Sequence, residues 1–381
     1  MSASRGKTRS RGVLRVALSC VTSAVVVLIL LLSKRGSSPA FAQQPQSPAA
    51  LAASASAAAG PARSRTPLKK APTAAGPIGP QRVAVGVYLH HVMQIDLRAN
   101  CFLADFYVWF RWKGDIDPTR SFELRNAIEQ WQIVKVPAYV DDAGNAAPLT
   151  LDDGSKYQVL RVEARLGRPF SVQQYPLDEQ DLPIEVEESK SSSSELVYDL
   201  DREATGVDRR IEIPGWVVSG STSKVDEAVF ETTFGDPRVA AGGERYTRMQ
   251  LNLHIVRPTR GMIVKTVVPL AIVILITFGV FFVEPHMIDA RLTLSVTALV
   301  SAVALHYSTT TELPEVGYLV LLDKVYILSY VVILGTCFTS IFAARFAENE
   351  QLEKARRLDL FGGIALSLAF FGGTAAALLV R

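Results

Sequence analysis

Four long apolar segments follow residue 258, and they limit what the chain can fold into more than any other feature. They run from about 262 to 283, 292 to 308, 318 to 343 and 358 to 380. A helix of about 20 apolar residues crosses the hydrocarbon core of a bilayer. The segments therefore predict four transmembrane helices, and the positive mean hydropathy of +0.20 argues against a simple soluble protein.

Charge is distributed unevenly along the chain. The formal net charge of +3 is the difference between 40 Lys and Arg and 37 Asp and Glu. Residues 1–80 hold about 11 basic and no acidic side chains, residues 81–257 about 20 and 28, and residues 258–381 about 9 of each. The near-neutral total therefore hides a basic leader, an acidic middle region of about −8 and a neutral membrane part.

The leader, residues 1–42, has the layout of a secretory signal. Basic residues precede an apolar run from Val16 to Leu32, and a small-residue site, Ala-Phe-Ala, follows at 40–42. Lys34 and Arg35 lie between the run and this site, so an uncleaved signal anchor is the alternative. Either form leaves the basic residues inside and exports the chain that follows.

Two regions separate the leader from the apolar segments. Residues 43–80 are rich in Ala, Pro and Ser, a composition that buries little surface and predicts a disordered linker. Residues 81–257 show period-two alternation, which predicts half-buried strands. The alternating residues include Val83, Val85, Val87, Leu89, Phe102, Ala104, Phe106, Val108, Phe110, Trp112, Leu182, Ile184, Val186, Met249, Leu251, Leu253 and Ile255. Short strands without a long helical pattern predict a β-sandwich.

The exported region contains no recognisable catalytic set. It lacks HExxH, GxSxG and a Gly-rich phosphate loop. Of the 3 cysteines, Cys20 lies in the leader and Cys337 in an apolar segment, which leaves Cys101 alone. We therefore expect no enzyme activity, disulfide, metal site, cofactor or nucleic-acid partner.

Two groups of titratable residues in this region are expected to occupy ordinary core or surface positions. His90 and His91 are adjacent on a predicted strand, so we expect them on opposite faces, one in the core and one at the surface. Glu185, Glu187 and Glu188 are expected to form a solvated face. The functional alternative is a negative vestibule that concentrates cations, or a set of groups that respond to pH.

The second apolar segment carries an unusual stripe of hydroxyls. At 100° per residue, one third of the helix circumference contains Asp289, Thr293, Thr297, Val300, Ser301, Ala304, Tyr307, Ser308 and Thr311. Such a face can pack between the helices of an ordinary bundle, and a carboxylate at a helix end can be an interfacial group. The functional interpretation is a water-filled pore.

One helix cannot enclose a pore, so the stripe predicts a symmetric oligomer with copies of this helix around an axis. Thr293 and Thr297 would form hydroxyl rings, Val300 an apolar ring that closes by dewetting, and Asp289 a carboxylate ring that selects cations at the cytoplasmic mouth. Arg291 lies nearby and complicates the sign of the charge there.

This order of parts resembles the pentameric ligand-gated ion channels, specifically their prokaryotic branch, over about residues 81–381. The resemblance depends on several short motifs in order rather than on any one of them. They are Tyr175-Pro176-Leu177-Asp178, Arg257, Pro269, Asp289-Ala290-Arg291-Leu292-Thr293-Leu294-Ser295, Glu312-Leu313-Pro314 and Tyr318 to Asp323. The missing cysteine pair of the animal members and the short link between the third and fourth helices fit prokaryotic members.

The resemblance implies roles for single residues. Asp96 and Asp178, the latter in the loop with Pro176, resemble acids that flank a basic residue at the domain junction, here Arg257. This arrangement would couple the sandwich to the first membrane helix, although an ordinary structural ion pair is also compatible with it. The agonist site between subunits is usually aromatic; the candidates Tyr139, Tyr198, Phe234 and Tyr246 form no complete box, and each is compatible with a plain core or surface position.

We therefore expect a periplasmic β-sandwich (81–257) followed by a four-helix transmembrane domain (258–381). The resemblance implies a homopentameric, ligand-gated or proton-gated channel for monovalent cations. It would lie in a bacterial inner membrane, with the sandwich and the C-terminus on the periplasmic side. The alternative is a membrane-anchored periplasmic binding or sensor protein that conducts no ions.

Overall fold

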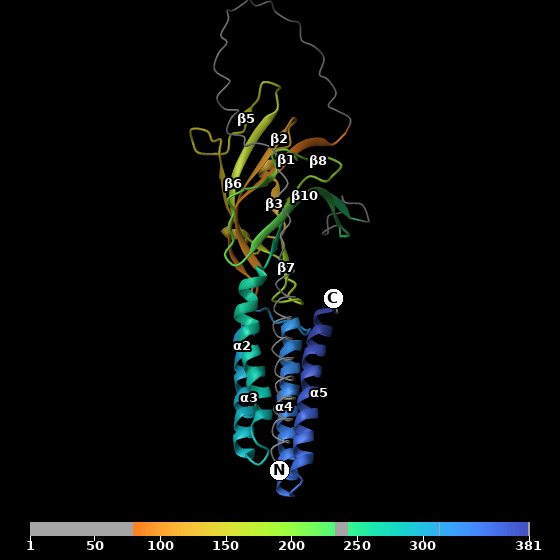
Figure 1. Ribbon diagram of the computed structural model, residues 1–381. Coiled ribbons are helices and arrows are strands. Elements are labelled where there is room, and N and C mark those ends of the chain that lie inside the picture. Colours follow the sequence, from red (N-terminus) through yellow and green to blue (C-terminus); the bar gives the residue numbers. More distant parts are fainter. Residues whose placement is uncertain (1–78, 233–242, 312, 380–381) are drawn as a thin grey trace, which may run out of the picture.

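A computed structural model of the chain describes residues 79–232, 243–311 and 313–379. The expected signal segment and nearly all of the expected linker lie outside the described residues. The described chain consists of a β-sheet part followed by a helical part, with the helices extending away from one end of the sheets (Figure 1).

The β part contains two sheets. The first has seven strands, with the order β4-β6-β2-β1-β8 and with β5 beside β6 and β9 beside β1; the second has four, in the order β10-β11-β7-β3. The strand bounds are β1 Gln81–Asp96, β2 Cys101–Trp112, β3 Phe122–Leu124, β4 Val134–Pro137, β5 Leu149–Thr150, β6 Lys156–Gly167, β7 Glu179–Glu188, β8 Leu196–Leu200, β9 Gly206–Val207, β10 Val217–Phe230 and β11 Glu244–Val256.

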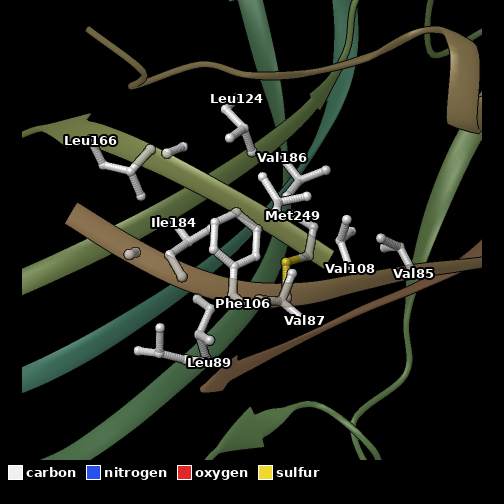
Figure 2. Close-up of a cluster of buried hydrophobic side chains, with 14 of the residues drawn as sticks. Val85, Val87, Leu89, Phe106, Val108, Leu124, Leu166, Ile184, Val186 and Met249 are labelled. Carbon is white, nitrogen blue, oxygen red and sulfur yellow. The ribbon is translucent and has the colours of Figure 1, made fainter. Parts of the chain in front are cut away.

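The alternating apolar residues of both sheets meet in one core. Figure 2 shows Phe106 and Leu166 of the first sheet among Ile184, Val186 and Met249 of the second. All of these side chains are fully buried. The period-two pattern therefore predicted the correct inward face, and the β-sandwich is confirmed.

The helical part contains four helices that are long and apolar enough to cross a membrane. They are α2 Thr259–Gly279, which contains Pro269 and continues into a 3₁₀ turn, η4, at Val280–Phe282; α3 Ile288–Thr310; α4 Leu321–Glu348; and α5 Leu352–Leu379. Helix α4 packs against α3 and α5, and α2 packs against α3. Both α4 and α5 extend beyond the apolar segments that predicted them, because charged residues at the α4–α5 link continue the helices.

The loop between β6 and β7 joins the two parts. Val172 and Tyr175 are buried in the same cluster as Leu270 of α2 and Leu322 of α4. The backbone N–H of Leu321 also donates to the carbonyl of Gln173 at 2.9 Å. The loop is therefore packed and hydrogen-bonded directly against the helices.

The core predicts a clear difference between two matched substitutions. We expect Phe106→Ala to lower the free energy of unfolding by about 3–5 kcal/mol, because a fully buried ring is replaced by a cavity. Val229→Ala, at an exposed position of β10, should change it by less than about 0.5 kcal/mol. Thermal unfolding of the detergent-solubilised full chain measures both; equal melting temperatures would contradict the assignment of the core.

Candidate functional site

Helix α3 turns the predicted stripe away from the other helices of the same chain. Its exposed residues include Asp289, Thr293, Thr297, Val300, Ala304 and Tyr307. The opposite side, formed by Arg291, Ser295, Ala298 and Ala302, is buried against the rest of the helices. Val300 is 64% exposed in the single chain. The stripe is therefore not used for packing within the chain.

The exposed face is wider than the predicted stripe. Val296 and Val303, which flank it, are also exposed. Ser301, a predicted member of the stripe, is half-buried, and its hydroxyl donates to the carbonyl of Thr297 at 2.8 Å. The face thus combines free hydroxyls of threonine with valine and alanine side chains, which is a surface that fits water or a neighbouring chain better than lipid tails.

Arg291 points away from the exposed face. Its side chain is 0% exposed, and it donates through Nη1 and Nη2 to the two carboxylate oxygens of Asp359 on α5, at 2.9 and 2.7 Å. Its Nε and Nη2 also donate to the carbonyl of Val283, at 3.1 and 2.5 Å. From the sequence alone, Arg291 could offset the charge of Asp289. In this structure the carboxylate of Asp359 compensates the charge of Arg291 on the buried side of α3.

A second polar contact holds α3 near its other end. The imidazole of His306 lies 2.9 Å from a carboxylate oxygen of Asp323 and 2.9 Å from the hydroxyl of Tyr330, both on α4. The ring also stacks on Tyr326, with centroids 4.5 Å apart. Sequence reasoning missed this contact and the Arg291–Asp359 pair. The available signal was the presence of isolated titratable residues of opposite type in otherwise apolar helices.

At the domain junction, Arg257 pairs with Asp178. The Nε of Arg257 donates to Oδ1 of Asp178 at 2.6 Å, and the two side chains are 11% and 1% exposed. The other oxygen of Asp178 accepts from Gln180 at 2.8 Å. The guanidinium also lies over the rings of Trp216 and Tyr175, at 4.2 and 5.1 Å from their centroids. Pro176 follows Tyr175 through a cis peptide bond.

Asp96 is not placed as the resemblance implies. It lines a cavity of about 570 Å³ together with Arg257, but the described residues show no ion pair between them. Its carboxylate instead accepts from the backbone N–H of Ala99 at 2.8 Å. Arg257 is therefore flanked by one acid and two aromatic rings rather than by two acids.

The aromatic candidates for an agonist site are dispersed. Tyr198 is buried in the sandwich core beside Phe110, so it is unavailable to a ligand. Tyr139 packs on Tyr157 at the seven-stranded sheet. Tyr246 packs on Phe230 on the outer face of the four-stranded sheet. Phe234 lies outside the described residues.

The expectation of a solvated glutamate face was wrong for two of its three members. Glu188 is fully buried at the end of β7, where it accepts from the hydroxyl of Ser121 at 2.7 Å and from backbone N–H groups. Glu187 is 2% exposed, and its Oε2 has no hydrogen-bond partner among the described residues. Glu188 has the same parity as Leu182, Ile184 and Val186, so alternation places it on the inward face. Glu187 lies on the outer face opposite Arg248 of β11, and its burial there depends on side chains of other elements, which alternation within β7 does not report.

Burial raises the pKa of Glu187, and the nearby charges of Arg125 and Arg248 oppose this effect. Arg248 lies opposite Glu187 in the register of β11 and β7, on the outer face of the sheet. The guanidinium of Arg125 lies 5.5 Å from the ring centroid of Phe230. A covered carboxylate, two guanidinium groups and the Phe230–Tyr246 pair therefore occupy one end of this face.

The histidine expectation was also wrong. The register of β1 shifts between Leu89 and His91, so His90 is an extra residue in a β-bulge. The two imidazoles lie together, with centroids 4.2 Å apart, and neither is buried. His90 contacts Asp208 at 3.2 Å.

Comparison with known proteins agrees with this architecture. No protein-family model matches the chain. The chain is 22% identical over 314 residues to a proton-gated ion channel of Gloeobacter violaceus. The aligned region covers 77% of this chain and 84% of that relative. The chain is 23% identical over 193 residues to a gamma-aminobutyric acid receptor subunit beta-like protein of Drosophila melanogaster and 21% over 194 residues to a gamma-aminobutyric acid receptor subunit beta of Caenorhabditis elegans. These matches cover half of this chain but only 35% and 32% of the receptor subunits.

A β-sandwich followed by four helices that are long and apolar enough to cross a membrane is the architecture of a multi-pass membrane protein. The chain is therefore similar to members of the pentameric ligand-gated ion channel superfamily, and the relatives it matches are ion channels and receptors.

The junction pair gives a testable consequence. We expect Arg257→Gln to destabilise the protein by about 3–5 kcal/mol, because it leaves the buried carboxylate of Asp178 without its cation. Arg82→Gln is the matched control: Arg82 and Asp199 form an exposed pair, which contributes about 0–1 kcal/mol. Thermal unfolding of the solubilised chain compares them. A loss for Arg257→Gln no larger than for Arg82→Gln would show that the junction pair is not structural.

Glu187 predicts a pH dependence of stability. Because its pKa is raised in the folded chain, the ionised form opposes folding, and this penalty grows as pH rises through the raised value. Glu187→Gln should therefore stabilise the protein at pH 7, and the gain should disappear as pH falls below about 4, where wild-type Glu187 becomes protonated in both states. Glu163→Gln, at an exposed position of β6, should change nothing. A gain that does not depend on pH would contradict the burial of an ionised Glu187.

Proposed function

We propose that the chain forms a homopentameric, cation-selective channel in which the exposed face of α3 from each subunit lines the pore. The observation that carries this proposal is the unused face of α3, on which Thr293 and Thr297 leave hydroxyls free while the back of the helix is packed. A membrane helix with such a face needs either water or further copies of the chain in front of it.

The order of residues along α3 suggests how such a pore would work. Asp289 lies in the first turn of the helix and would form a carboxylate ring that attracts cations at the cytoplasmic mouth. Thr293 and Thr297 would supply oxygen atoms to partly dehydrated cations. Val300 would form an apolar ring at mid-helix that closes the path by dewetting, and Ala304 and Tyr307 would line the wider outer part.

We further propose that the sandwich senses the stimulus and passes it through the junction set Arg257, Asp178, Pro176 and Asp96. The residues at the end of the four-stranded sheet support a ligand site there, because Glu187 is covered and incompletely hydrogen-bonded beside an aromatic pair. The two kinds of ligand in the relatives' names fit that chemistry: a proton would neutralise Glu187, and the ammonium of a small amine would pair with it. Tyr246 remains a candidate contact.

The topology proposed for this function places the sandwich and the C-terminus in the periplasm of a bacterium, with the channel in the inner membrane. The link between α4 and α5 is short, and basic residues flank it: Arg345 at the end of α4 and Lys354, Arg356 and Arg357 at the start of α5. Lys and Arg beside a short link favour its cytoplasmic location. The proposed signal segment 1–42 and linker 43–80 are consistent with this orientation.

The competing function is a membrane-anchored sensor that conducts nothing, and accessibility of α3 discriminates between the two. We expect Thr293→Cys, Thr297→Cys and Val300→Cys to react with water-soluble thiol reagents in bilayers and to block current when modified. Ala298→Cys, on the buried side of the same helix, is the matched control and should stay unreactive. If none of the front positions reacts at any pH or amine concentration, the sensor function stands.

Currents from purified protein in planar bilayers test the ion selectivity. The wild-type reversal potential should follow the gradient of the monovalent cation, and Asp289→Asn should reduce cation conductance because the charge of the ring is lost. A reversal potential that follows chloride, or that ignores the loss of Asp289, would overturn cation selection by this ring.

A further inference from the structure

The pore helix carries an acid and a base two residues apart, Asp289 and Arg291, near the proposed cytoplasmic mouth. If both side chains reached the pore, five copies would cancel and the mouth would have no net charge. In the structure the two side chains have different surroundings: Asp289 is exposed, whereas Arg291 is buried. The charge at the mouth therefore depends on what holds Arg291 behind the helix.

Two groups hold Arg291 in place, a neutral backbone carbonyl and a charged carboxylate. The carbonyl of Val283, at the end of η4, accepts two of its N–H groups, but a carbonyl carries no formal charge. Asp359 supplies the only carboxylate in ion-pair distance of Arg291 among the described residues, and it engages the guanidinium through both oxygens. A guanidinium stays charged at any physiological pH, so its burial in a membrane domain requires that carboxylate.

The arrangement of α5 shows that Asp359 is dedicated to this contact. Asp359 and Ala355, one turn earlier, are buried, whereas the neighbouring Arg356 and Arg357 are exposed. Glu353, also on α5, is exposed and lies 3.9 Å from Arg357. Only one acid of this helix is therefore turned inward toward α3.

We propose that Asp359, a residue of α5 that lies outside the stripe, is a positioning residue for ion selectivity: it keeps the charge of Arg291 out of the ion path and leaves Asp289 to set the sign of the mouth. This inference rests on the proposed cation channel. Without Asp359, the guanidinium would reach for water by extending its stem along the helix, and in the proposed channel the mouth beside Asp289 supplies that water.

The experiment measures reversal potentials of the full-length channel in bilayers under a salt gradient. Asp359→Asn keeps the size of the side chain and removes its charge, and we expect the cation-to-anion permeability ratio to fall. The double variant Arg291→Gln with Asp359→Asn removes the displaced cation as well, and it should restore the wild-type ratio. Glu353→Gln removes the same charge from an exposed position of α5 and should leave the ratio unchanged.

A second readout does not require conduction. In a chain carrying Thr293→Cys, the relative reaction rates of a positively and a negatively charged thiol reagent report the local potential. Asp359→Asn should lower the preference for the positive reagent, and adding Arg291→Gln should return it. If wild-type protein conducts no cations, the proposed function fails, while this ratio still decides where the charge of Arg291 lies.

Each outcome of these experiments either supports or overturns the inference. A permeability ratio and a reagent preference that Asp359→Asn leaves unchanged would overturn the inference, because Arg291 would then stay behind the helix without its acid. The same holds if Glu353→Gln shifts both readouts as much as Asp359→Asn does. If Asp359→Asn does not assemble, the double variant decides alone: recovery of assembly with cation selectivity supports the inference, and anion selectivity overturns it.

Discussion

The ion pair between Arg257 and Asp178 is the contact on which the connection of the two parts depends, and strand register determines it. The last ladder pair of β7 and β11 is Glu179 with Val256, so the next residues outward are Asp178 and Arg257. The backbone N–H of Arg257 lies 3.4 Å from the carbonyl of Asp178, in line with the ladder. A slip of one strand by one residue would turn its side chain to the opposite face of the sheet, so Arg257 and Asp178 would no longer meet.

The same register limits how the sandwich can move on the helices. Only Arg257 and Pro258 separate the end of β11 from the start of α2, and Pro258 has a fixed φ, here −69°. A link this short cannot absorb a rotation of the sheet, so displacement of β11 must reach α2. The buried loop containing Tyr175 gives a second connection, to α4 through Leu321. The coupling thus follows from covalent and packing constraints rather than from one charge pair alone.

Periodicity in the sequence predicted which face of a strand or helix points to the core. It could not predict burial or pairing that depends on residues of other elements. Alternation identified the inner faces of both sheets, and the 100° repeat identified the free face of α3 before any packing was visible. Glu187 could not be judged in this way, because burial on the outer face depends on side chains of other elements, whereas the alternation of β7 itself places Glu188 on the inward face. Tyr198 fitted an aromatic box as well as a core, and His90 required knowledge of a bulge. The partner of Arg291 lies 68 residues away in the chain, which no local pattern reports.

The polar contacts behind α3 differ at its two ends, and this difference bears on how the helix moves. Near the first turn, Arg291 and Asp359 are 0% and 10% exposed, so water cannot replace their contact and separation would leave a buried charge. Toward the other end, His306 and Asp323 are 23% and 19% exposed, so water can take over their hydrogen bonds at lower cost. Between them, small residues such as Ser295 and Ala302 allow close approach without interlocking. A tilt of α3 therefore costs least when it pivots near Arg291 and opens at the end that faces the sandwich.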